Sequence, residues 1–331
     1  MKSILTRLRL SPSDATLSGL FIVGAVVLTV ATGGNMLSHQ SVLSFFTYLC
    51  VPVLIGLSQM VVLAVGQLNL SIGAMGGVAT ALMAVAMADY GVPVPVALLL
   101  GLAVGGVVGA INGLLVVVTG LNGFIVTLGT MTVLLGVQYA LVQSFTIDAY
   151  SEALKGFGRI NLFGVPAVFA ITVVVAIALS LFFSRTVFGR RILATGGSEK
   201  AALLSGISNP RSTVAAFAVA GLLIGVAAMI TMTTLPGINR SIGGDWLLAS
   251  FAAPIIGGAL LTGGSVVVYG TIAAAMLLRL VDFARAQFSL DPSWTNFIIG
   301  AVVLTTVAIG EWRKRRHASS LLARPRREVT A

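Results

Sequence analysis

Long apolar segments follow one another along most of this sequence, with few charged residues between them. Only 9% of the 331 residues are Asp, Glu, Lys or Arg, and 57% are hydrophobic, whereas an average soluble protein has about a quarter charged residues. So few charges cannot solvate the surface of a soluble protein of this length, and disordered chains are polar and highly charged. The sequence therefore predicts an all-α membrane protein that crosses the bilayer several times.

A membrane-spanning helix needs roughly 20 apolar residues, so this chain has room for about ten. We predict a polar amino-terminal segment over residues 1–15, a transmembrane domain over 16–310 and a basic tail over 311–331. A cleaved signal peptide is the alternative for the first span, but the sequence ATGG that follows it is a poor cleavage signal. The predicted spans cover residues 16–33, 41–65, 70–88, 94–118, 123–143, 165–183, 213–235, 246–262, 265–284 and 293–310.

The basic residues are unevenly distributed between the predicted loops. With a cytoplasmic amino end, 15 of the 20 Lys and Arg residues lie on the cytoplasmic side, in the first segment, the loop 184–212 and the tail, and four lie outside. Cytoplasmic loops of membrane proteins carry such an excess. The bias supports ten spans with both ends in the cytoplasm. It also accounts for the net charge of +10, so we expect the lipid bilayer, and no nucleic acid, as a partner.

Catalytic and metal-binding patterns are missing from the sequence. The single cysteine, Cys50, cannot form an intrachain disulfide, and His39 and His317 lie far apart, which disfavours a zinc site. A P-loop requires Lys directly after Gly, and none of the four lysines follows a glycine. We therefore predict no catalytic, cofactor-binding or metal-binding residue and no enzyme activity. If ATP powers this protein, a partner hydrolyses it.

Four glycines, spaced four residues apart, mark one face of the predicted span 94–118. Glycines on one face let a neighbouring helix approach closely, and the resulting contacts replace the hydrophobic drive that helices lack inside a bilayer. Helix packing is favoured over a ligand role here, and Gly221 and Gly225 repeat the spacing in the span 213–235. The four glycines are Gly101, Gly105, Gly109 and Gly113.

The loop 184–212 is the longest polar loop on the predicted cytoplasmic side, and its sequence predicts a short helix. Two glycines break the chain, a serine can cap the first turn, a glutamate suits the positive end of the helix dipole, and a further glycine ends the helix. Three apolar side chains, Ala201, Leu204 and Ile207, would be free to dock on a partner or on the protein itself. The residues predicted to form this helix and its contact are Gly196, Gly197, Ser198, Glu199, Ala201, Ala202, Leu204, Ser205 and Gly206.

Three segments within the apolar regions are predicted to be irregular: residues 66–74, 119–123 and 254–265. Irregular backbone survives at membrane depth only where protein or a water-filled cavity satisfies its polar groups. For the first two segments a tight interfacial loop is the alternative. Polar side chains in these regions are candidates to line a solute pathway, although amides and hydroxyls equally bond neighbouring helices. The candidates are Gln59, Asn69, Ser71, Asn112, Asn122, Thr127 and Thr130.

A group of three charged residues, Arg279, Asp282 and Arg285, lies near the outer end of the ninth predicted span. Their spacing of three places them on one helical face. An ionisable residue within a membrane is a candidate for function. At the end of a span, however, such side chains can reach the interface or pair with one another, and we favour that structural explanation.

Five motifs, in this order, resemble the permease subunit of ribose-type sugar ABC importers, a family related to branched-chain amino-acid permeases. The resemblance extends over roughly residues 41–310, nearly the whole membrane part. Each motif is rich in glycine and apolar residues, and the specificity comes from finding all five in register. The motifs are GQLNLSIGAMGG, GAINGLLV, GFIVTLGTM, TVFGRRILATGGSEKAALLSGI and IIGGALLTGGSVVVYGT.

The resemblance implies a place in the bacterial inner membrane and import of a monosaccharide such as ribose, or a related sugar or polyol, by alternating access. It implies cytoplasmic ATPase subunits that bind ATP and Mg, an extracytoplasmic sugar-binding protein, and a second copy of the permease or a related permease. It also implies that Glu199–Gly206 is the coupling helix, seated in a groove of the ATPase. The family pattern GGIDLSVGA has an acid where this chain has Asn69, which leaves a hydrogen-bonding role at that position but no charge.

Two other functions remain open from the residues. A self-sufficient secondary transporter or channel would need acids within the spans for ion coupling, and the spans hold almost none apart from Asp282. A membrane scaffold without transport would bind no ATPase. The sequence does not name the solute or say whether two identical copies pair.

Overall fold

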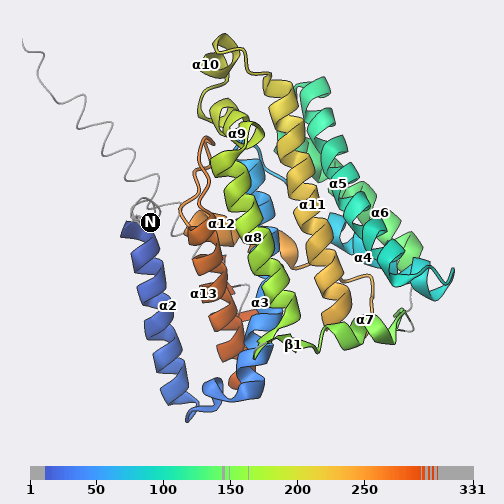
Figure 1. Cartoon of the computed structure of the whole chain (residues 1–331), viewed down its shortest axis with the longest axis vertical. Helices are drawn as coiled ribbons and strands as arrows, with labels where there is room; N and C mark the ends of the chain where they lie inside the picture. Colours follow the sequence, from blue (N-terminus) through green and yellow to red (C-terminus); the bar gives the residue numbers. More distant parts are fainter. Residues whose placement is uncertain are drawn as a thin grey trace, which may run out of the picture.

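The protein, represented by a computed structural model, is a bundle of helices (Figure 1). The structure describes residues 12–143, 146–148, 150–162 and 164–291, with a few positions between 293 and 304. The predicted end segments 1–15 and 311–331 and the span 293–310 therefore lie wholly or mostly outside the described residues. The long helices are α2 (Pro12–Ala31), α3 (His39–Leu63), α4 (Ile72–Ala88), α5 (Val94–Thr119), α6 (Gly123–Val142), α8 (Ala167–Arg185), α11 (Asn209–Thr234) and α13 (Val268–Gln287).

Six of these helices are long and apolar enough to cross a membrane, by length and composition. They are α2, α3, α5, α6, α8 and α11, and α4 is a shorter apolar helix of 17 residues. The remaining long helix, α13, has the length of a span but carries the charged group Arg279, Asp282 and Arg285. The prediction of an all-α protein that crosses the membrane several times is confirmed. The number of ten spans and the side on which the ends lie stay predictions.

One predicted span is wrong. The segment 246–262 was expected to cross the membrane, but its helix, α12 (Trp246–Ile256), has only 11 residues. At 1.5 Å per residue that is about 17 Å, well short of the roughly 30 Å hydrocarbon core. The chain then leaves the helix, and Gly258, Gly263 and Gly264 adopt positive φ angles. Glycine tolerates this conformation without strain, so the glycine-rich sequence favours an irregular hairpin over a longer helix.

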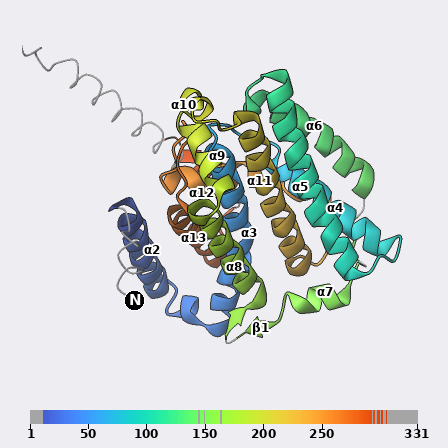
Figure 2. The same cartoon turned by 45° about the horizontal axis from the view of Figure 1, so that its top comes forward.

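Helix α11 lies between α3 and α5, as both views show (Figure 1, Figure 2). Its contact with α5 is the most extensive between any two described helices. Gly105 of α5 and Gly221 of α11 face each other so closely that a Cβ on either would overlap the carbonyl oxygen of the other. Gly109 likewise faces the Phe217 carbonyl, and Gly113 faces Val214. Glycine spacing on both helices thus allows their backbones to touch.

The two ends of the bundle carry different small elements (Figure 1). The α10 end holds α9 (Val187–Gly197) and α10 (Glu199–Leu204). The α7 end holds the 3-10 turn η1 (Asn35–Leu37), helix α7 (Glu152–Phe157) and an antiparallel hairpin of β1 (Asn161–Leu162) and β2 (Val165–Pro166). Helix α7 and strand β1 lie between the predicted spans 123–143 and 165–183, where no helix or strand was predicted.

Tyr150 fastens the segment before α7 to the end of α11. Its buried hydroxyl lies 2.6 Å from the Leu235 carbonyl oxygen and 3.0 Å from that of Met232, so it donates to this pair of acceptors. Burial, with a smaller contribution from the nearby Glu152 carboxylate, raises the pKa of Tyr150 to about 12. The uncharged phenol is therefore the form that the folded protein favours.

Candidate functional site

At both ends of the short helix α10, backbone groups find hydrogen-bond partners within the same segment. The Ser198 hydroxyl accepts a hydrogen bond from the Ala201 N–H at 3.3 Å, as an N-cap does. At the other end Gly206 has a φ of +75° and donates to the Leu203 carbonyl, while Ile207 donates to the Ala202 carbonyl, both at 2.9 Å. This pair of bonds is a Schellman motif, which needs glycine at the left-handed position. The N-cap at Ser198 and the helix end at Gly206 are therefore those predicted from the sequence.

The apolar side chains of α10 face away from the protein. Ala202 is the inward residue, with 3% of its surface exposed, whereas Leu204 is 90% exposed and Leu203 is 66% exposed. Ala201 is also exposed, and Ile207 is half-buried. Leu203 was not among the docking residues expected from the sequence. An exposed pair of leucines on a capped helix is a surface suited to a protein partner.

The glycine pair before α10 is not the break that the sequence analysis expected. Helix α9 continues through Gly196 and Gly197, and the chain turns only at Ser198. Their role is close packing: a Cβ on Gly196 would overlap the Ala64 carbonyl oxygen just after α3. Gly264, in the hairpin after α12, donates its N–H to the same carbonyl at 2.9 Å. We call this meeting of three chain segments the glycine junction; its members are Ala64, Gly66, Gly196, Gly197, Gly263 and Gly264.

Asn209, the first residue of α11, ties the small helices together. Its side-chain nitrogen donates to the Glu199 carbonyl at 2.9 Å, and its oxygen accepts from the Thr195 hydroxyl at 3.2 Å. Helices α9 and α10 are therefore bonded to α11 through one side chain. A displacement of α10 would act on α11 through this residue and on α3 through the glycine junction.

The irregular segment after α3 is held by polar side chains of α5 and α6. The Gln67 oxygen accepts from the Gly123 N–H at 2.7 Å, and the Thr127 hydroxyl accepts from the Leu70 N–H at 2.9 Å. The Asn69 oxygen accepts from both the N–H and the hydroxyl of Ser71, at 2.9 and 2.7 Å. Asn112 of α5 then donates to the same hydroxyl at 2.9 Å.

Four of the seven predicted pathway residues therefore meet in one buried network: Asn69, Ser71, Asn112 and Thr127. The network satisfies backbone groups that would be costly to leave unpaired in a membrane. Asn122 caps α6 by accepting from the Phe124 N–H at 2.9 Å, and the Thr130 hydroxyl donates to its own helix at 3.1 Å. Gln59 is buried elsewhere in α3. None of the seven lines the cavity described next, and substrate contact at each stays a prediction.

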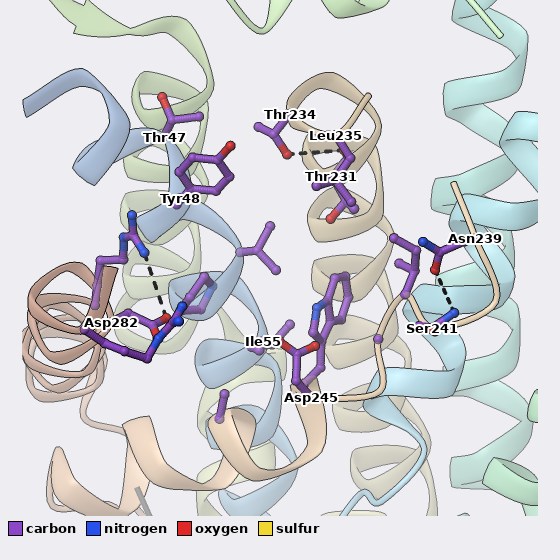
Figure 3. Close-up of a pocket in the computed structure, with 18 residues that line it drawn as sticks. Thr47, Tyr48, Ile55, Thr231, Thr234, Leu235, Asn239, Ser241, Asp245 and Asp282 are labelled. Carbon is purple, nitrogen blue, oxygen red and sulfur yellow. Dashed lines mark hydrogen bonds and ion pairs between the residues drawn. The ribbon is translucent and has the colours of Figure 1, made fainter. Parts of the chain in front are cut away.

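A cavity of about 560 Å³ lies among α3, α11, α12 and α13 in the α7 half of the bundle. Figure 3 shows Thr47 and Tyr48 on one side and Asn239 and Ser241 on the other, with Asp245 between them. Its size is that of a site for a small molecule. The lining mixes apolar surface from Ile55 and its neighbours with hydroxyl, amide and charged groups.

Small residues of α4 hold the loop that forms one wall of this cavity. A Cβ on Gly73 would overlap the Gly243 carbonyl oxygen, and one on Gly76 would overlap the Trp246 ring. Gln138 of α6 donates to the Ile242 carbonyl at 3.0 Å. The motif that contains Gly73 and Gly76 thus provides the space in which the loop 235–245 and the indole are seated.

Three charged side chains line the cavity from α13. Asp282 lies between two arginines, with 3.9 Å to Nη1 of Arg279 and 3.6 Å to Nε of Arg285. Arg279 also lies over the Tyr48 ring, 5.3 Å from its centroid. Asp282 thus pairs with both arginines, in line with the structural role favoured from the sequence. All three residues also line the cavity. Asn239, Asp245 and Trp246 were not predicted as site residues, because they lie in a predicted outer loop and at the start of a predicted span.

The cavity reaches only one half of α3. Tyr48, Val51, Pro52 and Ile55 line it, whereas Leu57, Met60 and Leu63 in the other half are at most 1% exposed. Such completely buried side chains are close-packed and leave no passage for a solute beside them. The described helices therefore hold a cavity in the α7 half and a closed core toward the α10 end.

These features define a helical membrane protein that crosses the bilayer several times, with a polar cavity in one half and a short exposed helix at the other end. A family model described as the permease component of the branched-chain amino acid transport system matches residues 41–307. The chain belongs to this family, and the resemblance seen in the sequence motifs is confirmed.

Similar proteins are permeases, and two of the three described here are named import permeases. The ribose import permease protein of Bacillus subtilis is 32% identical over 294 residues, which cover 88% of this chain and 90% of the relative. The galactose/methyl galactoside import permease protein of Haemophilus influenzae is 25% identical over 308 residues, covering 88% and 91%. A probable ABC transporter permease protein of Sinorhizobium fredii is 30% identical over 306 residues, covering 91% of each chain. No solved structure matches the chain.

Proposed function

We propose that this chain is the membrane-spanning permease of an ATP-driven importer that carries a monosaccharide or a related polyol across the bacterial inner membrane. The observation that carries the proposal is the cavity in the α7 half, with its closed core toward the exposed helix α10. In this proposal the α10 end faces the cytoplasm and the cavity belongs to an outward-facing state. The names of the relatives support sugar as the class of solute.

The cavity chemistry is suited to a polyhydroxylated solute. Carboxylates accept from hydroxyl groups and guanidinium groups donate to them, and Asp245, Asp282 and Arg285 supply both kinds. Trp246 adds an aromatic face on which the C–H surface of a sugar ring can pack. Ribose, galactose and similar small sugars all present these features, so the cavity chemistry supports the class rather than one member.

Helix α10 is the proposed contact with a cytoplasmic ATPase. Its exposed Leu203 and Leu204 would insert into a groove of that subunit, which binds ATP and Mg and performs the hydrolysis. Closure of the ATPases would push α10, and the glycine junction and Asn209 would pass the displacement to α3 and α11. Both helices line the cavity, so their tilting would close it on one side and open it on the other. An extracytoplasmic sugar-binding protein and a second permease copy, or a related permease, would complete the importer.

Substitution of the α10 surface tests the proposal. The importer, reconstituted in liposomes with its ATPase and binding protein, is compared with the double variant Ala201→Asp, Leu204→Asp. We expect sugar uptake to be lost while the permease still accumulates in the membrane, because two charges would enter an apolar contact. Lys200→Asp is the matched control, since it changes an exposed residue without removing apolar contact surface. Full uptake by the double variant, or uptake by the purified chain without ATPase, would contradict the proposal.

A further inference from the structure

Gln59 of α3 is a buried amide with neither polar atom engaged. Its side chain is completely buried, and among the described residues neither Nε2 nor Oε1 has a hydrogen-bond partner. The other buried amides in this part of the chain each have at least one bond, and they are Asn69, Asn112 and Gln138. A buried polar group without a partner is destabilising and is rare in folded proteins. Burial of the Gln59 amide therefore costs free energy of folding, and no hydrogen bond to a described residue offsets that cost.

Gln59 continues the face of α3 that lines the cavity. Tyr48, Pro52 and Ile55 lie on that face and line the cavity, and helical residues three or four positions apart are neighbours. Gln59 follows Ile55 by four residues, so it is about 6 Å further along the helix axis toward the α10 end. It is the next polar group on this face beyond the cavity.

The neighbours of Gln59 show that helix packing is achieved by other residues. The adjacent Ser58 hydroxyl donates to the Ala220 carbonyl of α11 at 2.9 Å and links the two helices. Met60 and Leu63 are buried apolar residues of the same stretch. A leucine or methionine at position 59 would suit this environment better than an amide does.

We propose that Gln59 is an inner binding site for the solute, which is closed in this state and becomes accessible when the Ile55 end of the cavity opens toward the α10 end. A carboxamide offers donors on its nitrogen and an acceptor on its oxygen, which match the hydroxyl groups of a sugar or polyol. The inference rests on the proposed function. It adds that α3 meets the same solute twice, first along the cavity and then at Gln59.

The complete importer in liposomes tests this proposal with Gln59→Met, which keeps the side-chain length and removes the hydrogen-bonding atoms. The probes are labelled D-ribose, D-galactose and D-fructose, and the comparison uses whichever the unsubstituted importer carries. We expect the uptake rate of the variant to fall by about tenfold, the effect of losing one or two hydrogen bonds along the pathway. Its unfolding temperature should stay the same or rise, because an unpaired buried amide is removed.

Gln138→Met is the matched control, because this substitution removes an amide that is bonded to the Ile242 carbonyl. It should lower the unfolding temperature, which separates a structural amide from a solute-binding one. Unchanged uptake by Gln59→Met would overturn the inference, and so would a lowered unfolding temperature like that of the control. If the unsubstituted importer carries no sugar or polyol with ATP, the proposed function fails first and the inference falls with it.

Discussion

Gly196, in the last turn of α9, lies so close to Ala64 that a Cβ on the glycine would overlap the Ala64 carbonyl oxygen. The same carbonyl accepts the N–H of Gly264 at 2.9 Å. The chain just before α10 is thus in backbone contact with the end of α3 and with the hairpin after α12. Backbone contacts of this kind cannot rearrange by a change of rotamer, so they are suited to transmitting a displacement.

Gly196→Ala should weaken the link between α10 and α3. The added methyl group would have to displace two backbones, and overpacking of this kind costs about 1–3 kcal/mol. We expect lower sugar uptake per ATP hydrolysed, measured in liposomes that contain the complete importer. Gly197→Ala is the control, because the nearest atom to its Cβ would be Gly264 Cα at 3.9 Å, an ordinary contact. Equal coupling in the two variants would argue against transmission through the glycine junction.

Gly109→Leu should prevent assembly of the helix bundle. A side chain at this position would overlap the Phe217 carbonyl of α11, and the two helices could pack only by separating. We expect little monodisperse protein by size-exclusion chromatography in detergent and a lower unfolding temperature. Gly129→Leu on α6 is the control, since nothing lies within 4 Å of its Cβ position among the described residues. Normal accumulation and transport by Gly109→Leu would refute the packing role.

Local sequence signals predicted the elements that depend on local chemistry. Ser198 and Gly206 bound α10 because capping bonds involve residues within one turn, and the glycine spacing on α5 identified a packing face. Irregular backbone over residues 254–265 was predicted from the glycines and the proline of that segment, whereas the short length of α12 was not, because its apolar composition also suits a full span. The role of Gly196 was missed for a related reason: its partners, Ala64 and Gly264, are distant in sequence.

The cavity could not be assembled from the sequence, because its walls come from four separate helices and one loop. Asp245 and Trp246 looked like the end of an outer loop and the start of a span, and only the folded structure shows that Gly243 and Trp246 pack against Gly73 and Gly76 beside the cavity. The only indication of a solute pathway in the sequence was the set of polar residues within the predicted spans. Most of these residues belong to the buried network around Asn69 and do not line the cavity.

Asp245→Asn should weaken solute binding in the cavity without unfolding the protein. Asp245 is exposed, it lines the cavity, and its side chain makes no capping bond to α12. Hydrogen bonds to a charged group contribute about 1.5–3 kcal/mol, so we expect the concentration for half-maximal uptake to rise by about tenfold or more. Asp89→Asn, at the end of α4, is an exposed control away from the cavity. Identical uptake curves for the Asp245 variant and the unsubstituted importer would remove this residue from the binding site.

Tyr150→Phe should make the stability of the protein less sensitive to alkaline pH. Burial raises the pKa of this phenol from 10.0 to about 12 in the folded protein, so the folded state holds its proton more strongly than the unfolded state does. The corresponding stability is fully present below pH 10 and is lost as the pH rises from 10 toward 12. Phenylalanine has no such proton. The variant should therefore lose less of its unfolding temperature across this window than the unsubstituted protein.

At neutral pH the same substitution should act in the opposite direction. It removes the hydroxyl that donates toward the Leu235 and Met232 carbonyls, at a cost of about 1 kcal/mol. The two unfolding temperatures should thus differ at pH 8 and converge toward pH 12, as measured by thermal unfolding in detergent. Tyr90→Phe, which changes an exposed tyrosine, controls for the loss of a hydroxyl at the surface. If the unfolding temperatures of Tyr150→Phe and the unsubstituted protein differ by the same amount at every pH, ionisation of Tyr150 does not cause the loss of stability at alkaline pH.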